Sequence, residues 1–344
     1  MTLSRRRFVG GLLSLPMAGW CRSSGAQAAA PTSIRLNIPG PGALPFMPVE
    51  MIPKLGMDQA LGMELQIRYF PSGVQGLEDM LAGNADFAGV GFTVLAKMLT
   101  KGQDVVAIAP FGGGKTPSFA IVVHQSLRGT VRSIADLKGR SVGVSIGSAK
   151  SKAYLQILAE LLLASHGVQP DQVRWVGIAQ NIEGQVGALV GKVVDAVFCE
   201  EPFPSGLVRR KVGFVLADLR DPRMSSRVPG AGHVRAAIAT TSALIRQDPA
   251  RAQLMVEMLR RAVDWMHNHK PEAIIARLEI ADAQERRDRI VALARSPDMF
   301  PPDARFSRSQ IEATREFLRA SGDRAAAAFD AQRLINDTWA GVRP

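Results

Sequence analysis

The hydrophobic positions of the chain fall into two alternating patterns. Short runs rich in β-branched and apolar residues, bounded by Gly, Pro or Asn, are typical of strands. Such runs occupy residues 34–38, 63–70, 86–91, 105–109, 119–123, 141–146, 173–176 and 195–198. Between them, apolar residues recur at helical spacing, most clearly over 154–162. Strands that alternate with helices predict an α/β architecture in which mostly parallel sheets are flanked by helices.

One phrase of this pattern occurs in both halves of the chain. In residues 81–88 an apolar helix end is followed by Gly83 and then by Asp86, which leads into a buried strand. In residues 189–197 the same order recurs with Gly191 and Asp195, separated by one residue more. The shared phrase predicts two lobes of like construction, not a long repeat array.

A helical tail follows Asp248-Pro249, which is typical of an N-cap with Pro at the first helical position. Amphipathic spacing predicts helices over 252–265, 271–278, 283–294 and 309–320. No strand pattern follows, so we expect the tail to pack on one of the lobes.

The N-terminal segment shows three chemical zones. A basic patch at 4–8 is followed by an apolar run over 9–20 and by Ala26-Gln27-Ala28, an A-x-A cleavage pattern. The apolar run is shorter than the roughly 20 residues that a membrane span requires. Residues 1–30 are therefore predicted to be a cleaved signal peptide, and Ser4-Arg5-Arg6-Arg7-Phe8-Val9 is similar to twin-arginine signals. The expected location is the periplasm; the alternative is an amphipathic N-terminal helix.

The sequence is basic, with 42 Lys and Arg against 31 Asp and Glu and a formal net charge of +11. Removal of residues 1–30 would take away four arginines and no acids, which leaves a charge of about +7. Such a surface favours anions, but no polybasic run marks a nucleic-acid site, and no nucleic-acid partner is predicted.

Cysteine and metal chemistry have little support in the sequence. Only Cys199 would remain after cleavage, which excludes an intramolecular disulfide and a cysteine zinc site. No residues have the spacing of a metal site, and no nucleotide or flavin motif is evident. The sequence thus predicts no metal and no cofactor.

Two segments partly match enzyme motifs. Residues 109–116 nearly fit a phosphate-binding loop, but Pro117 and a strand-like run follow where that motif needs a helix. This segment is better interpreted as a crossing between lobes. Gly143-Val144-Ser145-Ile146-Gly147 fits the nucleophile-elbow pattern, although β-branched residues run through Ser145 and favour a strand there. A hydrolase that uses Ser145 remains the alternative.

Candidate ligand-binding residues lie where predicted strands end, because ligands of open α/β sheets bind outside the carboxyl ends of strands. Gly147-Ser148-Ala149 opens a helix there, and its free N–H groups favour a carboxylate, sulfonate, nitrate or phosphate; a simple helix cap is the alternative. The other candidates are Gly40, Ser72, Gly73, Gly91, Phe92, Gln180, Asn181 and Glu201.

Three segments together resemble a known family. They are residues 136–144 with 147–149, residues 189–197 with Glu201-Pro202, and residues 83–88 with Gly91. This ordered set resembles the periplasmic solute-binding proteins of nitrate/sulfonate/taurine-type ABC importers, a group related to thiamine-pyrimidine-precursor-binding proteins. The resemblance covers roughly residues 34–265.

The resemblance implies a type II periplasmic binding protein fold with two crossing strands, at 119–123 and 234–239. Lobe 1 would be 31–118 plus 236–344, and lobe 2 would be 119–235. A monomer of this kind would close by a hinge motion over a small anionic solute and deliver it to an ABC permease in the membrane.

The same resemblance suggests which residues would meet an anion, namely Gly147, Ser148 and Ala149 with Ser72, Gly73 and Gly91 opposite. Two alternatives stay open. One is an enzyme like the pyrimidine synthases of this fold, although the chain lacks their Cys-rich motif. The other is a sensory binding protein that reports to a membrane kinase.

Overall fold

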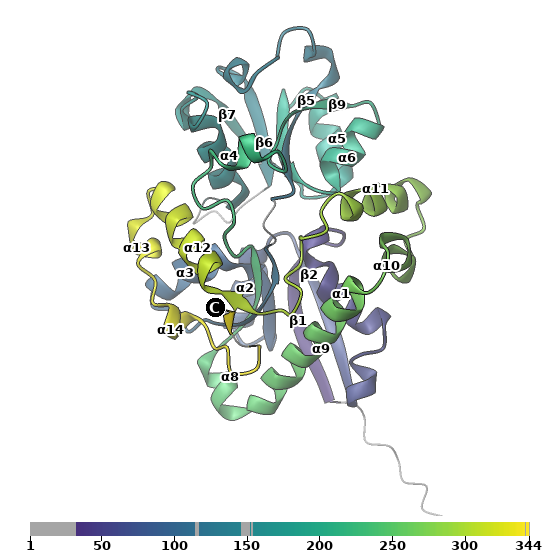
Figure 1. The fold of residues 1–344 in the computed structure, drawn as a ribbon, viewed down its shortest axis with the longest axis vertical. Helices are drawn as coiled ribbons and strands as arrows, with labels where there is room; N and C mark the ends of the chain where they lie inside the picture. The colour runs from purple at the N-terminus through teal and green to yellow at the C-terminus, as the bar shows by residue number, and fades with distance from the viewer. Residues whose placement is uncertain (1–31, 114–116, 146–151, 153, 341, 344) are drawn as a thin grey trace, which may run out of the picture. The chain divides into compact units, whose positions relative to one another are not determined.

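The computed structural model describes residues 32–113, 117–145, 152, 154–340 and 342–343. The predicted signal peptide lies outside these residues. Within them the chain forms two five-stranded sheets flanked by helices (Figure 1). No helix in this described part combines the length and the apolarity needed to cross a bilayer.

The first sheet has the strand order β2-β1-β3-β10-β4. Its strands are β1 (Thr32–Pro39), β2 (Met63–Phe70), β3 (Phe87–Gly91), β4 (Val106–Gly112) and β10 (Ala236–Thr240). The helices between these strands are α1 (Met47–Lys54), α2 (Gly73–Leu81) and α3 (Phe92–Thr100). Strand β10 runs antiparallel to both of its neighbours, while β1 pairs in parallel with β2 and β3.

The second sheet repeats this arrangement in the order β7-β6-β8-β5-β9. Its strands are β5 (Phe119–His124), β6 (Ser141–Ser145), β7 (Arg174–Ile178), β8 (Ala196–Glu200) and β9 (Gly213–Asp218). Its helices are α4 (Tyr154–Ala164), α5 (Ile182–Val190), α6 (Phe203–Arg209) and α7 (Pro222–Ser225). Here β5 is the strand that runs antiparallel to both neighbours. Each sheet is therefore mixed, and its antiparallel strand is the one that the chain forms directly after leaving the other sheet.

The chain passes between the sheets at two places, from β4 to β5 and from β9 to β10. The first passage contains the segment that partly matches a phosphate-binding loop. Its residues 109–112 belong to β4, and strand β5 follows Pro117, so the helix that such a loop requires does not come next. Lys115 and Thr116 lie outside the described residues.

The repeated sequence phrase has the same structural role in both sheets. The carboxylate of Asp86 accepts a hydrogen bond from the backbone N–H of Arg35, and that of Asp195 accepts one from Ser141. Each aspartate, directly before its own strand, thus bonds to the backbone of a parallel neighbouring strand. The left-handed residue that ends the preceding helix is Gly83 in one copy and Lys192 in the other, which accounts for the shifted spacing.

The tail begins with α8 (Ser242–Gln247) and the long helix α9 (Pro249–His267). Asp248 caps α9 by accepting from Arg251 N–H at 3.0 Å, as its position before Pro249 predicts. The apolar stripe of α9, including Met255, Leu259 and Val263, packs on α1 and the first sheet, and all three are fully buried. Each such side chain stabilises the fold by about 1.5–3 kcal/mol.

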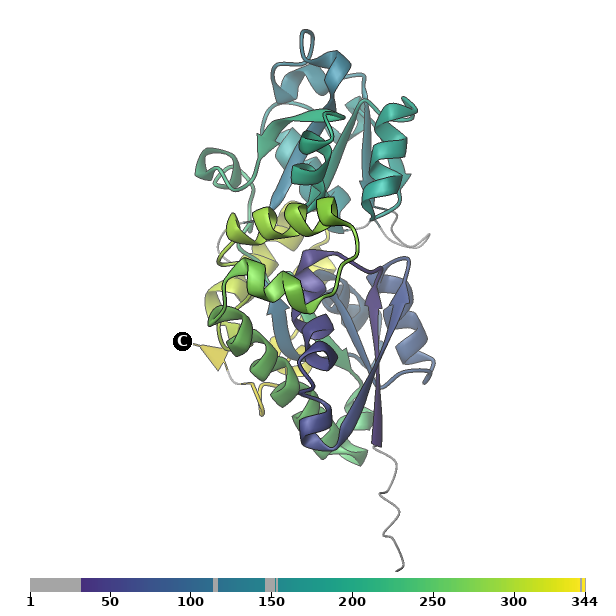
Figure 2. The same ribbon diagram turned by 90° about the vertical axis from the view of Figure 1, so that its right-hand side faces the viewer.

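The remaining tail forms the three predicted helices, together with short helices after residue 320 and two short strands that no pattern predicts (Figure 2). The helices are α10 (Pro271–Arg277), α11 (Ala283–Ala294), α12 (Arg308–Ala320), α13 (Arg324–Ala327) and α14 (Ala331–Leu334). The strands are β11 (Phe306–Ser307) and β12 (Val342–Arg343). Helix α11 contacts α6, so the tail also reaches the helices of the second sheet, which the prediction of packing on one lobe does not include.

Candidate functional site

A small pocket, called here the inner pocket, lies where the carboxyl ends of strands from both sheets meet. It has a volume of about 90 Å³. It is lined by Pro39, Pro45, Phe46, Ser72, Gly73, Val74, Val90, Gly91, Val94, Ser145, Tyr154, Leu155, Gln180, Glu200, Arg235 and Ala236. Most of this lining is apolar, so the few polar groups determine which ligand group fits.

The central polar group of the inner pocket is the guanidinium of Arg235, directly before β10. It lies 4.3 Å from the centroid of the Phe119 ring, and one of its terminal nitrogens donates to Oε1 of Glu200. Glu200 also accepts from the hydroxyl of Ser118 at 3.1 Å. Because Arg235 leads into the first sheet and Glu200 ends β8 of the second, this buried ion pair joins the two sheets.

Two polar atoms in this pocket have no hydrogen-bond partner among the described residues. They are Nε of Arg235 and the hydroxyl of Tyr154, and both atoms are buried. The Arg235 guanidinium lies 6.0 Å from the centroid of the Tyr154 ring. Buried polar atoms are nearly always paired, because an unpaired donor loses its hydrogen bonds to water. These two donors are therefore candidate partners for an acceptor group of a ligand.

The buried groups around the pair are displaced from their ordinary ionisation. Burial raises the pKa of Glu200, and the charge of Arg235 opposes that shift. Burial also raises the pKa of Tyr154, so its hydroxyl keeps its proton and remains a donor. The pKa of His233 is lowered to about 3, first by burial and second by Arg235. His233 is accordingly a neutral ring in the wall behind Tyr154, at 5.4 Å between ring centroids.

Two helices begin at the inner pocket. Ser72 is the N-cap of α2, and its hydroxyl accepts from Gln75 N–H at 3.3 Å. Gly91 is the N-cap of α3, whose first N–H, that of Phe92, donates to the carbonyl of Arg235 at 3.1 Å. Helix N-termini favour acceptor groups because their first N–H groups lack partners within the helix. Gly73 lies so close to Val90 that a Cβ there would be 3.2 Å from a side-chain carbon.

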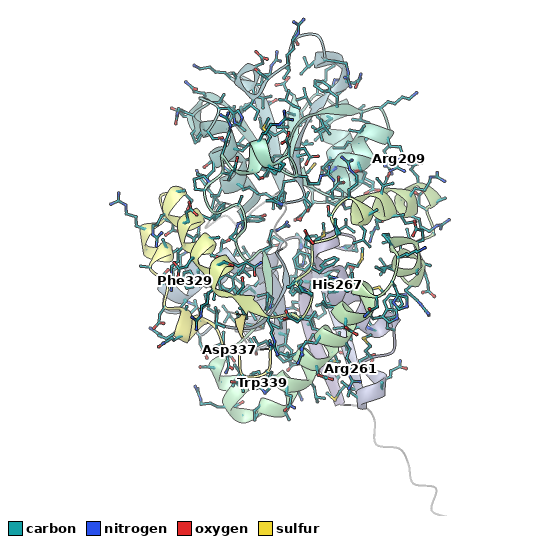
Figure 3. All side chains as sticks on the ribbon, viewed as in Figure 1. Arg209, Arg261, His267, Phe329, Asp337 and Trp339 are labelled. Carbon is teal, nitrogen blue, oxygen red and sulfur yellow. The ribbon has the colours of Figure 1, made fainter. Side chains whose placement is uncertain are left out.

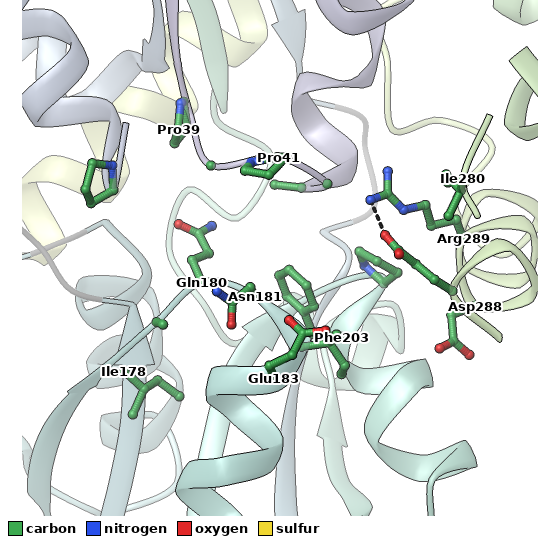
Figure 4. A pocket seen from close by; sticks show the side chains of 18 of the residues that line it. Pro39, Pro41, Ile178, Gln180, Asn181, Glu183, Phe203, Ile280, Asp288 and Arg289 are labelled. Carbon is green, nitrogen blue, oxygen red and sulfur yellow. Dashed lines mark hydrogen bonds and ion pairs between the residues drawn. The ribbon is translucent and has the colours of Figure 1, made fainter. Parts of the chain in front are cut away.

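A larger space, called here the outer pocket, adjoins the inner one and shares Pro39 and Gln180 with it (Figure 4). Its volume is about 660 Å³. It is lined by Pro39, Gly40, Pro41, Gly42, Ala43, Pro71, Ile178, Ala179, Gln180, Asn181, Ile182, Glu183, Pro202, Phe203, Arg210, Ile280, Ala281, Glu285, Asp288 and Arg289. Strand ends of both sheets and helix α11 of the tail therefore form its walls.

The arginines of the outer pocket are matched by carboxylates. Arg210 donates to Asp288 at 2.6 Å. The neighbouring Arg209, labelled in Figure 3, contacts the other oxygen of Asp288 at 2.7 Å. Arg289 pairs with Glu285, one turn earlier on α11, at 2.5 Å. These pairs leave neither lining arginine without a counter-charge.

Most of the predicted binding residues that the structure describes lie at the two pockets. Ser72, Gly73 and Gly91 line the inner pocket, Gly40 lines the outer one, and Gln180 lines both. Asn181 also lines the outer pocket, where it caps α5 by accepting from Gly184 N–H at 2.7 Å. Gly147, Ser148 and Ala149 lie outside the described residues, so their predicted role remains a prediction.

Phe92 and Glu201 are placed differently. Phe92 is fully buried and packs against Phe306 and Phe329 of the tail. Glu201 is buried too and accepts from Ser205 and Arg220. Neither is among the residues found to line the two pockets; the adjacent Glu200 faces the inner one.

The sequence reasoning missed Arg235, Glu200 as the lining carboxylate, and the hydroxyl of Tyr154. One signal for Arg235 was present, since it is a lone charge within the otherwise apolar run predicted to cross between the lobes. A charge in a buried strand needs a partner, and that partner marks a site. Tyr154 had no comparable signal, because it belongs to an ordinary apolar helix face.

Catalytic chemistry has limited support at this site. Ser145 lines the inner pocket, but the hydrogen bonds found for the histidines go to other groups, such as that from His233 to the carbonyl of Gly230. Burial raises the pKa of the Cys199 thiol, which keeps it protonated. Over the described ranges, no three His, Cys, Asp or Glu residues are grouped as metal ligands.

Comparison with solved structures identifies the fold as that of the periplasmic binding proteins. A protein from Bordetella bronchiseptica RB50 is 21% identical, with 90% of this chain and 96% of that chain aligned at a TM-score of 0.77. The alkanesulfonate-binding protein SsuA from Xanthomonas axonopodis pv. citri, bound to MOPS, is 17% identical over 90% and 100% of the chains, with a TM-score of 0.69. The periplasmic nitrate-binding protein NrtA from Synechocystis PCC 6803 is 12% identical over 90% and 87%, with a TM-score of 0.64. The predicted two-lobed α/β fold is thereby confirmed.

The family follows from the sequence itself. The model of the NMT1-like family matches residues 43–281, which is most of the chain, so the chain belongs to the NMT1-like family. No curated protein matches the sequence. The match contains the inner-pocket residues from Pro45 to Ala236 and ends before helix α11.

Proposed function

We propose that the protein is the solute-binding component of an ABC importer, which captures a small solute bearing an acid group and delivers it to a membrane permease. The observation that carries this proposal is the pair of buried donors without partners, Arg235 Nε and the Tyr154 hydroxyl, in a pocket lined by both sheets. Similarity in fold to sulfonate- and nitrate-binding periplasmic proteins supports the same reading.

The acid group is inferred from the kind of polar atoms that the inner pocket offers. Arg235 Nε, the Tyr154 hydroxyl and the first-turn N–H groups of α2 all donate, and the oxygens of a sulfonate, carboxylate or nitrate accept. Glu200 offsets the charge of Arg235. Recognition would therefore rest on directed hydrogen bonds within an apolar surround, where each bond is strong.

Capture would proceed by closure of two lobes, 31–118 with 236–344 and 119–235, about the two passages between the sheets. The support is that residues of both sheets line each pocket, so a bound solute would contact both lobes. A ligand shifts such an equilibrium by the contacts that it makes only in the closed state. A closing cleft needs no second subunit, and we propose a monomer in the periplasm, exported through residues 1–30.

A thermal-shift screen of nitrate, taurine, other sulfonates, carboxylates and pyrimidines tests this function. At a hundredfold excess over Kd, a specific ligand stabilises the folded state by about 2.7 kcal/mol, which is a shift of several degrees. An acid that produces this shift in a saturable manner supports the proposal. If no anion or pyrimidine shifts the melting temperature, or if the protein shows an esterase activity that Ser145→Ala abolishes, the importer function is wrong.

A further inference from the structure

The two pockets differ in size in a way that bears on the ligand. The inner pocket, at about 90 Å³, accommodates only a compact group, whereas the outer one, at about 660 Å³, falls within the range of sites for complete organic molecules. They share Pro39 and Gln180, so one ligand can occupy both. A solute no larger than nitrate would leave most of the cleft filled with water.

The charges of the outer pocket restrict what can enter it. Its described lining carries two arginines and three carboxylates, and each arginine is already paired with a carboxylate of α11. The remaining carboxylate, Glu183, is exposed. Around these charges lie Phe203, Ile178 and several prolines, which favour contact with a ring or an alkyl group. A second acid group would meet unfavourable charge here, whereas an uncharged or basic body would not.

Much of this lining belongs to the tail. Glu285, Asp288 and Arg289 all come from α11, which begins after the end of the family match. The inner pocket, in contrast, is lined by residues inside the match apart from Pro39. The head group would therefore meet mainly the family-matched part of the chain, whereas the rest of the ligand would also meet α11.

We propose that α11 is a specificity-determining wall. The solute carries one compact acid group, held in the inner pocket, and a bulky body that is uncharged or basic and lies in the outer pocket against α11. This inference rests on the proposed function and specifies the class of solute. The pairing of Arg289 with Glu285 gives the arginine charge a counter-charge, so it offers a second acid no unopposed charge.

Calorimetric titration with a matched ligand series tests the proposal on the full-length folded protein. The probes are nitrate, methanesulfonate, benzenesulfonate, MOPS and benzene-1,3-disulfonate. We expect benzenesulfonate or MOPS to bind at least tenfold more tightly than methanesulfonate or nitrate, and at least fivefold more tightly than the disulfonate. Glu285→Gln releases Arg289 and is expected to raise the affinity for the disulfonate at least fivefold.

The control is Glu257→Gln, which removes the equivalent i,i+4 partner of Arg261 on α9. Neither Glu257 nor Arg261 is among the pocket-lining residues, so no change in any affinity is expected. Tight binding of nitrate or methanesulfonate without a gain from the larger probes would overturn this inference and leave the proposed function intact. An unchanged affinity of Glu285→Gln for the disulfonate would likewise overturn this inference and leave the proposed function intact. If no probe in the series binds and the wider screen is also negative, the proposed function itself fails.

Discussion

At the scale of single residues, packed aromatic rings hold Tyr154 in the wall of the inner pocket. Tyr154 packs edge-on against Phe119 and His233, and His233 stacks on Phe317 at 4.5 Å between ring centroids. Nδ1 of His233 lies 2.9 Å from the carbonyl of Gly230, which accepts its hydrogen bond. This aromatic stack fixes the position of the Tyr154 hydroxyl relative to Arg235.

The buried imidazole makes stability depend on pH. The pKa of His233 is about 3 in the folded protein and 6.5 in its ordinary state, so between these values the unfolded chain binds a proton that the folded protein does not. The free energy of unfolding therefore falls as the pH is lowered below 6.5. Between pH 7.5 and 5.0 this group is expected to account for a loss of about 2 kcal/mol. Urea denaturation at the two pH values measures this loss in the free energy of unfolding.

His233→Gln is the comparison for this prediction, because glutamine does not titrate. The variant changes packing, so the quantity to compare is the difference between the two pH values within each protein. The wild type is expected to lose about 2 kcal/mol more than the variant. Equal losses in the two proteins would show that His233 is not the buried neutral ring described here.

Residue-scale prediction from the sequence succeeded where a residue has a local backbone role. Ser72 and Asn181 are both N-caps at strand ends, and capping requires the same side-chain oxygens and position that marked them as candidates. Arg235 and Glu200 were not predicted as site residues, because their importance arises from a contact across 35 positions in the sequence. Nothing in the residues around either one specifies the other.

At the scale of elements, the loop before β10 is tied closely to α12. Gly230 has a φ of +68°, and a Cβ at this position would lie 2.2 Å from the carbonyl oxygen of Ala313 and 2.5 Å from the N atom of Phe317. Both atoms belong to the backbone of α12 and cannot move without displacing the helix. Gly232, two residues later, has open space around its Cβ position.

Gly230→Ala is accordingly expected to lower the free energy of unfolding by more than about 2 kcal/mol, through left-handed strain and a steric clash with backbone. Gly232→Ala is the matched control and should change it by less than about 0.5 kcal/mol. Chemical denaturation of both variants measures the difference. Comparable stability of the two would contradict the packing of this loop on α12.

Element positions were predictable where short-range chemistry determines them. The pairs Asp86 with Arg35 and Asp195 with Ser141 repeat one bond, from the residue directly before a strand to the backbone of the parallel neighbour, and the phrase in the sequence reflects it. Helix α11 follows its apolar spacing over residues 283–294 as predicted. The antiparallel strands β5 and β10 were not predictable as such, because strand direction depends on the path of the whole chain.

At the scale of the whole molecule, the two sheets are joined by more than the two passages of the chain. Asp288 of α11 is buried and binds both Arg209, the last residue of α6, and Arg210, its C-cap. The Arg235–Glu200 pair makes a second connection deeper in the cleft. The tail thus helps to hold the helices of the second sheet in place beside the outer pocket.

Replacement of Asp288 by Asn should weaken this connection. The two arginines are about 30% exposed and can regain water, so the expected loss of stability is about 1–3 kcal/mol, less than for a fully buried pair. Glu257→Gln, which breaks an exposed pair on α9, should cost less than about 0.5 kcal/mol. A calorimetric melt of each variant compares them. If Asp288→Asn has the same melting temperature as the wild type, the connection between α6 and α11 contributes nothing to stability.

The central claim, that the inner pocket is the solute site, predicts opposite behaviour for the two tyrosines of the chain. The hydroxyl of Tyr154 is buried without a described partner, whereas that of Tyr69 donates to Glu50 at 3.1 Å and lies outside both pockets. Tyr154→Phe should therefore leave the ligand-free protein as stable as the wild type or more so by about 1 kcal/mol. Tyr69→Phe should cost about 1 kcal/mol, because it leaves Glu50 without that bond.

The most direct test is a calorimetric titration of both variants with the acid that gives the largest shift in the thermal screen. We expect Tyr154→Phe to lower its affinity about tenfold, the equivalent of one lost hydrogen bond, while Tyr69→Phe binds as the wild type does. If Tyr154→Phe binds with unchanged affinity, or if both variants lose affinity equally, the solute does not bind in the inner pocket.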